Sequence, residues 1–331
     1  MKKALLLLLC MALLTGCAAR GDEALQAPTG AQPPAPSLPP ELSSDGETPT
    51  LSVYVAEDGT ISEMDIETYV AGVVAGEMRN DWPLEALKAQ AILARTFVVR
   101  FVGEKESRYA GADVSTDISE AQAYDRASVN DRVAQAVAET AGQVLVTADG
   151  EFPYTWFHAH SGGVTALARE GLGWRDAEPS YTRSTEGLDS DAAPPEARSW
   201  RATFAAEPFL AACRRAGCAA ERLRDVKVEE VGESGRAVTL TVDGHEVNAA
   251  RLRIELGSTT MRSTLLTELT CDGKSVVMAG RGYGHGVGMP QWGAYALAED
   301  GMTGEEIALH YYNGLRLVTL WRAPAQSKNG G

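Results

Sequence analysis

The side chain with the clearest capacity for chemistry is Glu77, which follows a run of small and apolar residues from Val70 to Gly76. Apolar surroundings favour the neutral form of a carboxyl group and so raise its pKa. A glutamic acid in such a place can donate a proton near neutral pH, as a general acid must. Considered alone, a glutamate at this position is more commonly a solvated or capping residue. The chemistry therefore depends on what surrounds it.

A helix is predicted shortly after Glu77 and would hold it in place. Apolar residues recur in steps of three and four and fall on one face, which indicates an amphipathic helix. These residues are Leu84, Leu87, Ala91, Ala94, Val98 and Phe101. Asp81 is placed to cap the helix, Pro83 suits its first turn, and Arg95 projects further along it.

A second segment reads HAHSGG from His158 to Gly163. It is predicted to follow a hairpin between residues 143–147 and 151–157. Backbone amides of a Ser-Gly-Gly turn can approach a ligand closely, because glycine has no Cβ. The two histidines share a face if the segment is extended, but no further metal ligands cluster there. Metal binding, a structural bond to a carbonyl and a place in a substrate groove all stay open.

A third segment is rich in glycine and reads GRGYGHGVGMPQWGAYA from Gly280 to Ala296. Glycine at this density disfavours ordinary core packing, so we expect an exposed loop that leads into a helix. The backbone of that loop would present four side chains, Tyr283, His285, Gln291 and Trp292.

These segments resemble motifs of the stage II sporulation protein D family, also called the SpoIID/LytB domain. The run around Glu77 is similar to the family motif E-M-P-x-x-W-P-x-E-A-L-K-A-Q-A, with Arg79 where proline is usual. Residues 122–124 match Q-x-Y, and residues 157–165 match F-H-x-x-S-G-G-x-T. The glycine-rich segment matches G-R-G-x-G-H-G-V-G-M-S-Q-W-G-A, with Pro290 in place of serine.

The resemblance implies a lytic transglycosylase, which cuts the glycan strands of peptidoglycan. One carboxyl group protonates the oxygen that links N-acetylmuramic acid to N-acetylglucosamine, then accepts the proton of the muramic 6-hydroxyl as a 1,6-anhydro ring closes. No water enters, so a second acid–base carboxylate is not required. The resemblance gives Glu77 this role and implies no cofactor. The substrate-binding residues that it implies are Arg95, Gln122, Tyr124, His158, Ser161, Gly162, Gly163, Tyr283, His285, Gln291 and Trp292.

Some members of the family carry Cys and His zinc ligands just upstream of the glutamine in Q-x-Y. This chain has Thr116, Ser119, Glu120 and Ala121 in that region. Hard oxygens and a methyl group cannot form the thiolate–imidazole set that zinc prefers. We therefore expect no zinc at this position and assign no metal site.

Two other functions stay open beside the transglycosylase. A non-catalytic scaffold lipoprotein of the engulfment machinery could bind peptidoglycan in the same groove, although the presence of Glu77 argues against it. A hydrolytic muramidase would add water and leave reducing ends. The resemblance also implies strands already stripped of stem peptides. It therefore implies a partner amidase and other engulfment proteins, during sporulation of an endospore former.

The amino terminus predicts export and membrane anchoring. Residues 1–16 combine two lysines with a short apolar run, as in a signal peptide, and residues 14–17 read LTGC, a lipobox. We expect cleavage before Cys17, lipidation of its thiol and an extracytoplasmic lipoprotein that faces the cell wall; a plain secretory signal is the alternative. Residues 17–50 hold seven of the 15 prolines and predict a disordered linker, and residues 326–331 a disordered tail.

The folded domain is predicted between residues 51 and 325. A hairpin at its start, a helix near residues 131–141 and strands within 226–242 favour a mixed α+β fold with antiparallel hairpins around a glycan-binding groove. The pattern changes at about residues 200–275, which leaves room for a smaller inserted subdomain. At 331 residues and 44% hydrophobic content, the chain can bury a substantial core.

Net charge limits the possible partners, and the cysteine spacing bears on disulfide formation. The formal net charge is −15, which argues against nucleic acid as a partner, because nucleic-acid binding requires basic surfaces. A neutral or weakly charged glycan is compatible with it. Cys213 and Cys218 are spaced for a small-loop disulfide in an oxidising compartment, but free buried thiols are equally consistent with the sequence.

Overall fold

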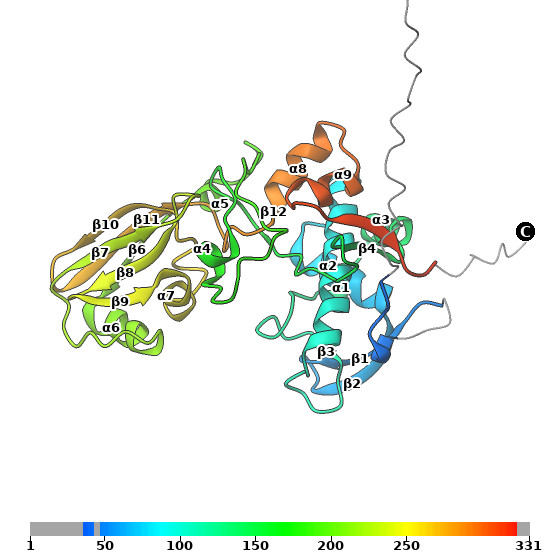
Figure 1. Cartoon of the computed structure of the whole chain (residues 1–331), viewed down its shortest axis with the longest axis horizontal. Coiled ribbons are helices and arrows are strands. Elements are labelled where there is room, and N and C mark those ends of the chain that lie inside the picture. The colour runs from blue at the N-terminus through cyan, green and yellow to red at the C-terminus, as the bar shows by residue number, and fades with distance from the viewer. Residues whose placement is uncertain (1–35, 43–46, 323–331) are drawn as a thin grey trace, which may run out of the picture. The chain divides into compact units, whose positions relative to one another are not determined.

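The structure is a computed structural model that describes residues 36–42 and 47–322. The predicted signal peptide, Cys17, most of the predicted linker and the tail at 326–331 lie outside these residues. Figure 1 shows helices and small sheets interspersed along the chain. The predicted α+β class is confirmed.

The first hydrophobic core surrounds one long helix, α2 (Leu84–Glu104). It is packed by α1 (Ile66–Glu77), α3 (Asp131–Glu139), α8 (Gln291–Glu299) and α9 (Gly304–His310). Residues on all sides of α2 are buried, because helices and strands cover it all round. The predicted helix is therefore confirmed, but its one-sided amphipathic character is wrong. Asp81 does not cap it: the N-cap is Pro83, and the Asp81 carboxylate pairs with Arg79.

The predicted hairpin at the start of the domain is confirmed. Strands β1 (Thr50–Val55) and β2 (Thr60–Asp65) pair antiparallel, and β3 (Val114–Ser115) adds to β1 in parallel. The last residue of β2, Asp65, caps α1 by accepting a hydrogen bond from the Thr68 amide at 2.8 Å. This cap fixes where α1 begins, and therefore where its other end, Glu77, lies.

The second predicted hairpin is wrong. Strand β4 (Gln143–Val146) pairs antiparallel with β13 (Arg316–Thr319) from the end of the domain. The turn at residues 147–151 forms, with the Thr147 amide donating to the Glu151 carbonyl at 2.9 Å. The chain beyond it continues to β5 (Phe157–His158), which pairs in parallel with β12 (Met289–Pro290). Both pairings bring the carboxy-terminal motifs to the first half of the chain.

A second hydrophobic core is made by residues between Trp200 and Met278. It lies between two three-stranded sheets and two helices, seen together in Figure 1. The elements are β6 (Ser199–Ala205), α6 (Ala206–Arg215), β7 (Val226–Val231), β8 (Ala237–Val242), β9 (His245–Asn248), α7 (Ala249–Glu255), β10 (Leu266–Cys271) and β11 (Ser275–Arg281). Cys213 and Cys218 are buried in this core as free thiols, and burial raises the pKa of Cys213 to about 12.

Part of the predicted disordered linker is ordered. A 3₁₀ turn, η1 (Pro40–Leu42), places Leu42 in the first core with 1% of its surface exposed, and η1 packs against α2. Burying one large apolar side chain offsets the entropy of ordering a few residues. Three further short helices complete the description: η2 (Arg126–Ser128), α4 (Ala168–Leu172) and α5 (Pro195–Arg198).

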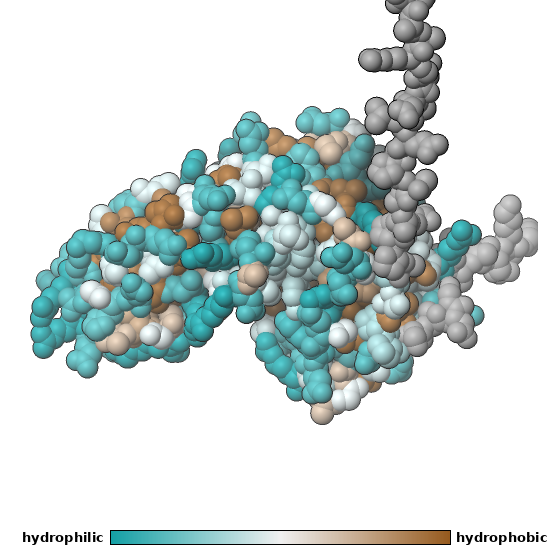
Figure 2. All heavy atoms as spheres, in the orientation of Figure 1, coloured by the Kyte–Doolittle hydropathy of each residue, from teal (hydrophilic) through white to brown (hydrophobic). Residues whose placement is uncertain are grey.

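The surface drawn in Figure 2 is mostly hydrophilic, with apolar side chains in small groups. Within residues 36–42 and 47–322, no helix is both long and apolar enough to cross a membrane.

Candidate active site

Glu77 is the last residue of α1 and is half-buried. Its Oε1 accepts a hydrogen bond of 2.7 Å from the backbone amide of Ala123. Burial raises the pKa of Glu77 above its usual value, and the hydrogen bond from Ala123 and the nearby Gln291 side chain partly oppose that rise. The carboxyl group is thus held in the protonated form to higher pH than a solvated glutamate.

Two glycines of α1 allow the 122–125 segment to lie directly against the helix. A Cβ at Gly76 would be 2.7 Å from the Tyr124 backbone nitrogen, and one at Gly72 would be 2.2 Å from the Tyr124 ring. Real side chains do not fit at these distances. The small residues before Glu77 therefore have a structural purpose, because they let the Ala123 amide reach the carboxylate.

Helix α8 brings Gln291 and Trp292 to the same place from the far end of the domain. Gln291 is 7% exposed, and its Nε2 makes no hydrogen bond of ordinary geometry to any described residue. The side chain is nevertheless close enough to Glu77 to lower the pKa of that carboxyl. Trp292 packs on Trp82 with ring centroids 4.5 Å apart, and Tyr295 contacts both rings.

The loop that follows Glu77 is fixed by hydrogen bonds with residues 128–132. The Asn80 side chain donates to the Ser128 carbonyl at 2.9 Å, and Asn130 donates to the Asn80 carbonyl at 3.1 Å. Arg132 donates to the Trp82 carbonyl at 3.2 Å. The backbone of residues 80–82, next to Glu77, is thus held in place without the proline that the family motif has at position 79.

Two open cavities, each of about 440 Å³, are lined in part by residues of the 124–128 segment. Gly76, Glu77, Asn80, Asp81 and Ser128 are among the residues that line the first. The second is lined by residues that include Met64, Thr116, Tyr124, Asp125 and Arg126. Tyr124 is half-buried, so part of its ring faces the second cavity.

His158 is buried, with 4% of its area exposed. Its Nδ1 lies 3.2 Å from the Val287 carbonyl and must carry the proton, which leaves Nε2 as an acceptor. That Nε2 is buried without a hydrogen-bond partner among the described residues. The His285 ring lies 5.6 Å away, with its pKa lowered to about 3 by burial and by the nearby Arg253 and Arg236. Burial also lowers the pKa of His158, so both imidazoles are neutral.

The Ser-Gly-Gly turn is held from two directions. Asp189 accepts a hydrogen bond of 2.9 Å from the Ser161 amide and a short one from the Ser161 hydroxyl. The fully buried guanidinium of Arg236, just before β8, donates to the carbonyls of Ser161 and Val164 at 2.6 and 2.9 Å. Sequence reasoning missed Ala123, Asp189 and Arg236: Ala123 is the unspecified position of the Q-x-Y motif, and the other two lie outside the motifs.

Comparison with known proteins decides the family. The model of a family described as "Stage II sporulation protein" matches residues 55–146. Stage II sporulation protein D of Bacillus amyloliquefaciens is 30% identical over 290 residues, which cover 82% of this chain and 81% of that protein. The chain belongs to the stage II sporulation protein D family. An uncharacterized protein of Brachyspira hyodysenteriae is also 30% identical, over 78% of this chain and 68% of its own length. An amidase enhancer of Bacillus subtilis is 27% identical, over 75% of this chain and 40% of that protein.

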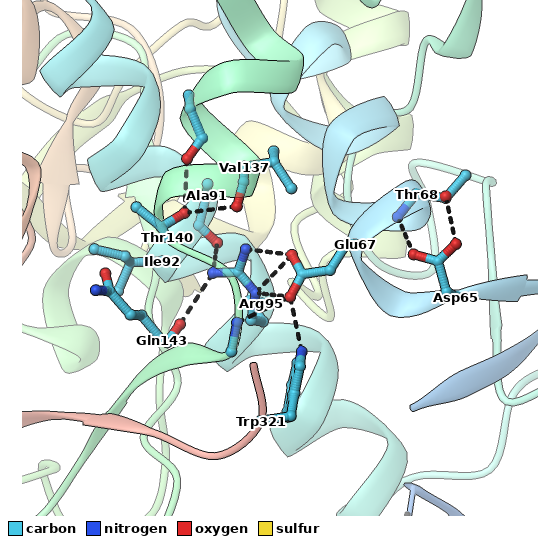
Figure 3. A network of polar contacts seen from close by, with 12 residues as sticks. Asp65, Glu67, Thr68, Ala91, Ile92, Arg95, Val137, Thr140, Gln143 and Trp321 are labelled. Atoms are coloured by element: carbon cyan, nitrogen blue, oxygen red, sulfur yellow. Dashed lines mark hydrogen bonds and ion pairs between the residues drawn. The ribbon is translucent and has the colours of Figure 1, made fainter. Parts of the chain in front are cut away.

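For one predicted groove residue of this family member, the structure requires a correction. Arg95 is fully buried and pairs with Glu67 at 2.5 Å, as Figure 3 shows. It also donates to the Gln143 carbonyl at 3.0 Å, while Glu67 accepts from the Trp321 indole at 2.9 Å. Arg95 therefore ties α1, α2, β4 and the end of the domain together, and a sugar cannot reach it.

The glycine-rich segment is another correction. It leads into helix α8 as predicted, but it is not an exposed loop: Gly286, Val287 and Gly288 are buried, and Tyr283 and His285 are half-buried. A Cβ at Gly286 would be 2.4 Å from the Arg236 guanidinium, and one at Gly288 would be 2.0 Å from the Trp156 carbonyl. Glycine here allows closer packing instead of preventing it.

Several of the remaining predicted residues are covered. Gln122 is 3% exposed, with neither polar atom of its amide hydrogen-bonded to a described residue. Ser161 and Gly162 are buried, Gly163 is exposed, and Tyr283 lies under the Arg262 guanidinium at 5.1 Å. Their part in substrate binding stays a prediction.

The region that holds zinc ligands in some family members does not fit zinc here. The Thr116 hydroxyl accepts the Ala56 amide at 2.9 Å, and the Glu120 carboxylate binds the Ser107 hydroxyl and the Arg108 amide. These oxygens are hard ligands already engaged within the protein. Across the described part of the chain, no three His, Cys, Asp or Glu side chains come together in a way that could hold a metal ion.

Proposed function

We propose that this member of the stage II sporulation protein D family is a peptidoglycan lytic transglycosylase that acts during sporulation. The observation that carries the proposal is the environment of Glu77: a half-buried carboxyl group with a raised pKa at the edge of an open cavity. The other carboxylate that lines the cavity, Asp81, is 61% exposed and paired with Arg79. One protected acid and one solvated ion pair suit a reaction that needs a single acid–base group.

Glu77 would act twice in this mechanism. As an acid it donates its proton to the glycosidic oxygen between N-acetylmuramic acid and N-acetylglucosamine, which then leaves. As a carboxylate it accepts the proton of the muramic 6-hydroxyl while O6 bonds to C1, which gives the 1,6-anhydro end. Ala123 and Gln291 favour the carboxylate once the proton has left, whereas burial favours its return. The opposing influences suit a group that must change state twice in each turnover.

The two cavities beside the 124–128 segment would hold sugar rings on either side of the bond to be cut. Tyr124 offers part of an aromatic face, and the exposed Arg126 offers hydrogen-bond donors to hydroxyl and amide oxygens. Gln122, His158 and Gln291 are buried nearby: Gln122 precedes Ala123, and His158 pairs with Pro290, next to Gln291.

The cellular setting is part of the same proposal. The lipobox at residues 14–17 supports lipidation of Cys17 and an extracytoplasmic location facing the wall. Similarity to a protein named amidase enhancer supports a cell-wall setting in which an amidase is a partner. An amidase would supply strands without stem peptides, and other engulfment proteins would accompany it.

The test is mass spectrometry of the products formed from peptide-free glycan strands. Wild-type protein should produce 1,6-anhydro-muramic ends, and Glu77→Gln should lower the rate by about 10²–10⁴-fold, the usual contribution of a general acid–base group. Asp81→Asn is the matched control, because it alters a carboxylate in the same cavity and should keep most of the activity. Reducing ends would indicate a muramidase. Binding of strands without cleavage by wild-type protein would overturn the proposal in favour of a scaffold.

A further inference from the structure

A third cavity, of about 460 Å³, lies outside the Glu77 site between the Ser-Gly-Gly turn and residues 186–191. The Glu77 site and this cavity are neighbours, because the Ser190 amide, at the cavity wall, donates to the carbonyl of Trp292 at 3.1 Å. Trp292 follows Gln291, whose side chain acts on Glu77. A polymer bound at the Glu77 site would reach this cavity along the Ser190–Trp292 contact.

The wall of the cavity carries a strained residue. Leu188 has a φ of 52°, a left-handed conformation that is costly for a bulky side chain, and 39% of it is exposed. Its neighbours are held tightly: the Gly187 carbonyl accepts the Tyr311 hydroxyl at 2.9 Å, and Asp189 binds Ser161. The left-handed backbone of Leu188 thus places an apolar side chain at the cavity and not in the core. Backbone strain of this kind is concentrated at binding and catalytic sites.

The cavity also presents cationic and hydrogen-bond donating groups. Arg198 and Arg281 line it, both are exposed, and neither forms an ion pair with a residue that the structure describes. Two unpaired arginines are notable in a chain with a net charge of −15. Arginine binds carboxylates through parallel hydrogen bonds, so the pair is suited to an anionic group.

His160 adds a donor of fixed tautomer. Its Nδ1 accepts a hydrogen bond of 3.0 Å from the Gly162 amide, so in the neutral ring the proton must be on Nε2. Burial lowers the pKa of His160 below its usual value, although Asp189 opposes this, and the ring is therefore neutral at physiological pH. The imidazole lines the cavity and can donate to a ligand oxygen.

The acidic residues of the cavity must be accounted for. The Asp189 carboxylate is directed at Ser161 and His160 and is 5% exposed, so it is committed within the protein. Glu186 and Asp191 are exposed and line the same cavity. Carboxylates of this kind accept hydrogen bonds from hydroxyl and amide groups, which abound on N-acetylated sugars. A ligand that combines one carboxylate with such groups matches the mixed lining better than a simple anion does.

From this lining we propose that the cavity is a subsite for a muramic acid residue whose lactyl carboxylate is free, with Arg198 and Arg281 as the residues that bind that carboxylate. The proposal rests on the proposed function for the identity of the polymer. In peptidoglycan the lactyl carboxyl is either bound in an amide to the stem peptide or free after an amidase has cut that bond. Binding of the free carboxylate by two guanidinium groups would make this chain select strands from which the peptide has been removed.

The test is a binding measurement with the full chain carrying Glu77→Gln, so that strands are not cut. The probes are amidase-treated glycan strands and the same strands after their carboxylates have been converted to methylamides. Strands with free carboxylates should bind about 10- to 100-fold more tightly than the methylamide strands, as expected for hydrogen bonds to a charged group. Adding Arg198→Gln and Arg281→Gln should abolish that difference and weaken its dependence on salt. Adding Arg201→Gln instead should preserve it, because this nearby exposed arginine of β6 pairs with Glu268.

The strained residue gives a second measurement. Leu188→Gly should relieve the backbone strain and so not lower the thermal stability, yet it should weaken binding of both probes, because the apolar contact is lost. Equal binding of the two probes, or a difference that survives loss of both arginines, would overturn the subsite. Cleavage by the wild-type chain is measured separately. Selective binding without anhydro products would support the subsite and contradict the transglycosylase activity. Anhydro products without selective binding would support the activity and contradict the subsite.

Discussion

The carboxylate of Glu77 accepts a 2.7 Å hydrogen bond from the backbone amide of Ala123, 46 residues further along the chain. This bond favours the ionised carboxylate, while burial, the larger influence, favours the neutral acid. The pKa of Glu77 is therefore above its usual value in the folded protein. Stability and activity should both depend on pH in ways that follow from this single residue.

Ionisation of Glu77 should lower the free energy of unfolding only above acidic pH. Because the pKa is raised by folding, the stabilising influence of the protonated form is fully present below the pKa of the unfolded chain and is lost as pH rises through the folded value. Glu77→Gln cannot ionise, so it should be more stable than wild type at neutral pH and equal to it in acid. Thermal unfolding of both proteins across this pH range measures the difference.

Asp81→Asn provides a control of opposite sign. The exposed pair with Arg79 lowers the pKa of Asp81, so any stability it contributes is present at neutral pH and lost in acid. The variant should therefore be equal to or slightly less stable than wild type at neutral pH. A stability difference between Glu77→Gln and wild type that does not change with pH would contradict the raised pKa.

Gln291 should set the alkaline limit of activity. Its side chain lowers the pKa of Glu77, so Gln291→Met should raise that pKa and keep the acid protonated to higher pH. The alkaline limb of the kcat/KM profile should then move to higher pH, even if the maximum rate falls. Gln135→Met, on the exposed face of α3, should leave the profile unchanged. A profile that falls in height without moving would show that Gln291 acts only through packing.

The close contact between Gly72 and Tyr124 should be visible as an energetic coupling. Gly72→Ala places a methyl group 2.2 Å from the present position of the Tyr124 ring, so the ring and the adjoining Ala123 amide must move. We expect a loss of stability of about 1–3 kcal/mol and reduced activity. In Tyr124→Ala the space is free, so adding Gly72→Ala there should cost almost nothing more. A double-mutant cycle in unfolding experiments measures the coupling, and additive effects would contradict the contact.

The buried pair of Arg95 and Glu67 should matter for folding and not for substrate affinity. Arg95→Met leaves the Glu67 carboxylate without its cation, and such a loss usually costs about 3–5 kcal/mol. Arg95→Met with Glu67→Met should be less destabilised than the sum of the single changes. The fraction that remains folded should have an unchanged KM. A raised KM with normal stability would restore Arg95 to the substrate groove.

Local sequence was sufficient for the elements whose determinants lie close together in the chain. The β1–β2 hairpin, α2, α3 and the strands β7 and β8 follow from apolar periodicity and turn residues between neighbours. The family motifs were enough to indicate the family and to single out Glu77. Patterns of this kind are written in short stretches, which is why they can be read without a structure.

Pairings between distant segments were beyond the reach of local sequence. Strand β4 has the composition of a hairpin strand, but its partner is β13, about 170 residues away. Arg95 was predicted to bind substrate, because nothing near it in the chain shows that Glu67 and Trp321 enclose it. Leu42 lies in a proline-rich stretch of apparent linker, yet the side of α2 provides a site for it.

The sequence by itself determined which chemical groups this protein has: one acid in an apolar stretch, histidines beside a glycine turn, and a glycine-rich run that ends in Gln291 and Trp292. Only the tertiary structure decided how they are used. Gly72 and Gly76 admit the Ala123 amide to Glu77, α8 brings Gln291 against the same carboxyl, and Arg236 from the second core holds the Ser161 turn. The reason is physical, since pKa values and hydrogen bonds depend on spatial neighbours, which packing assembles from distant parts of the chain.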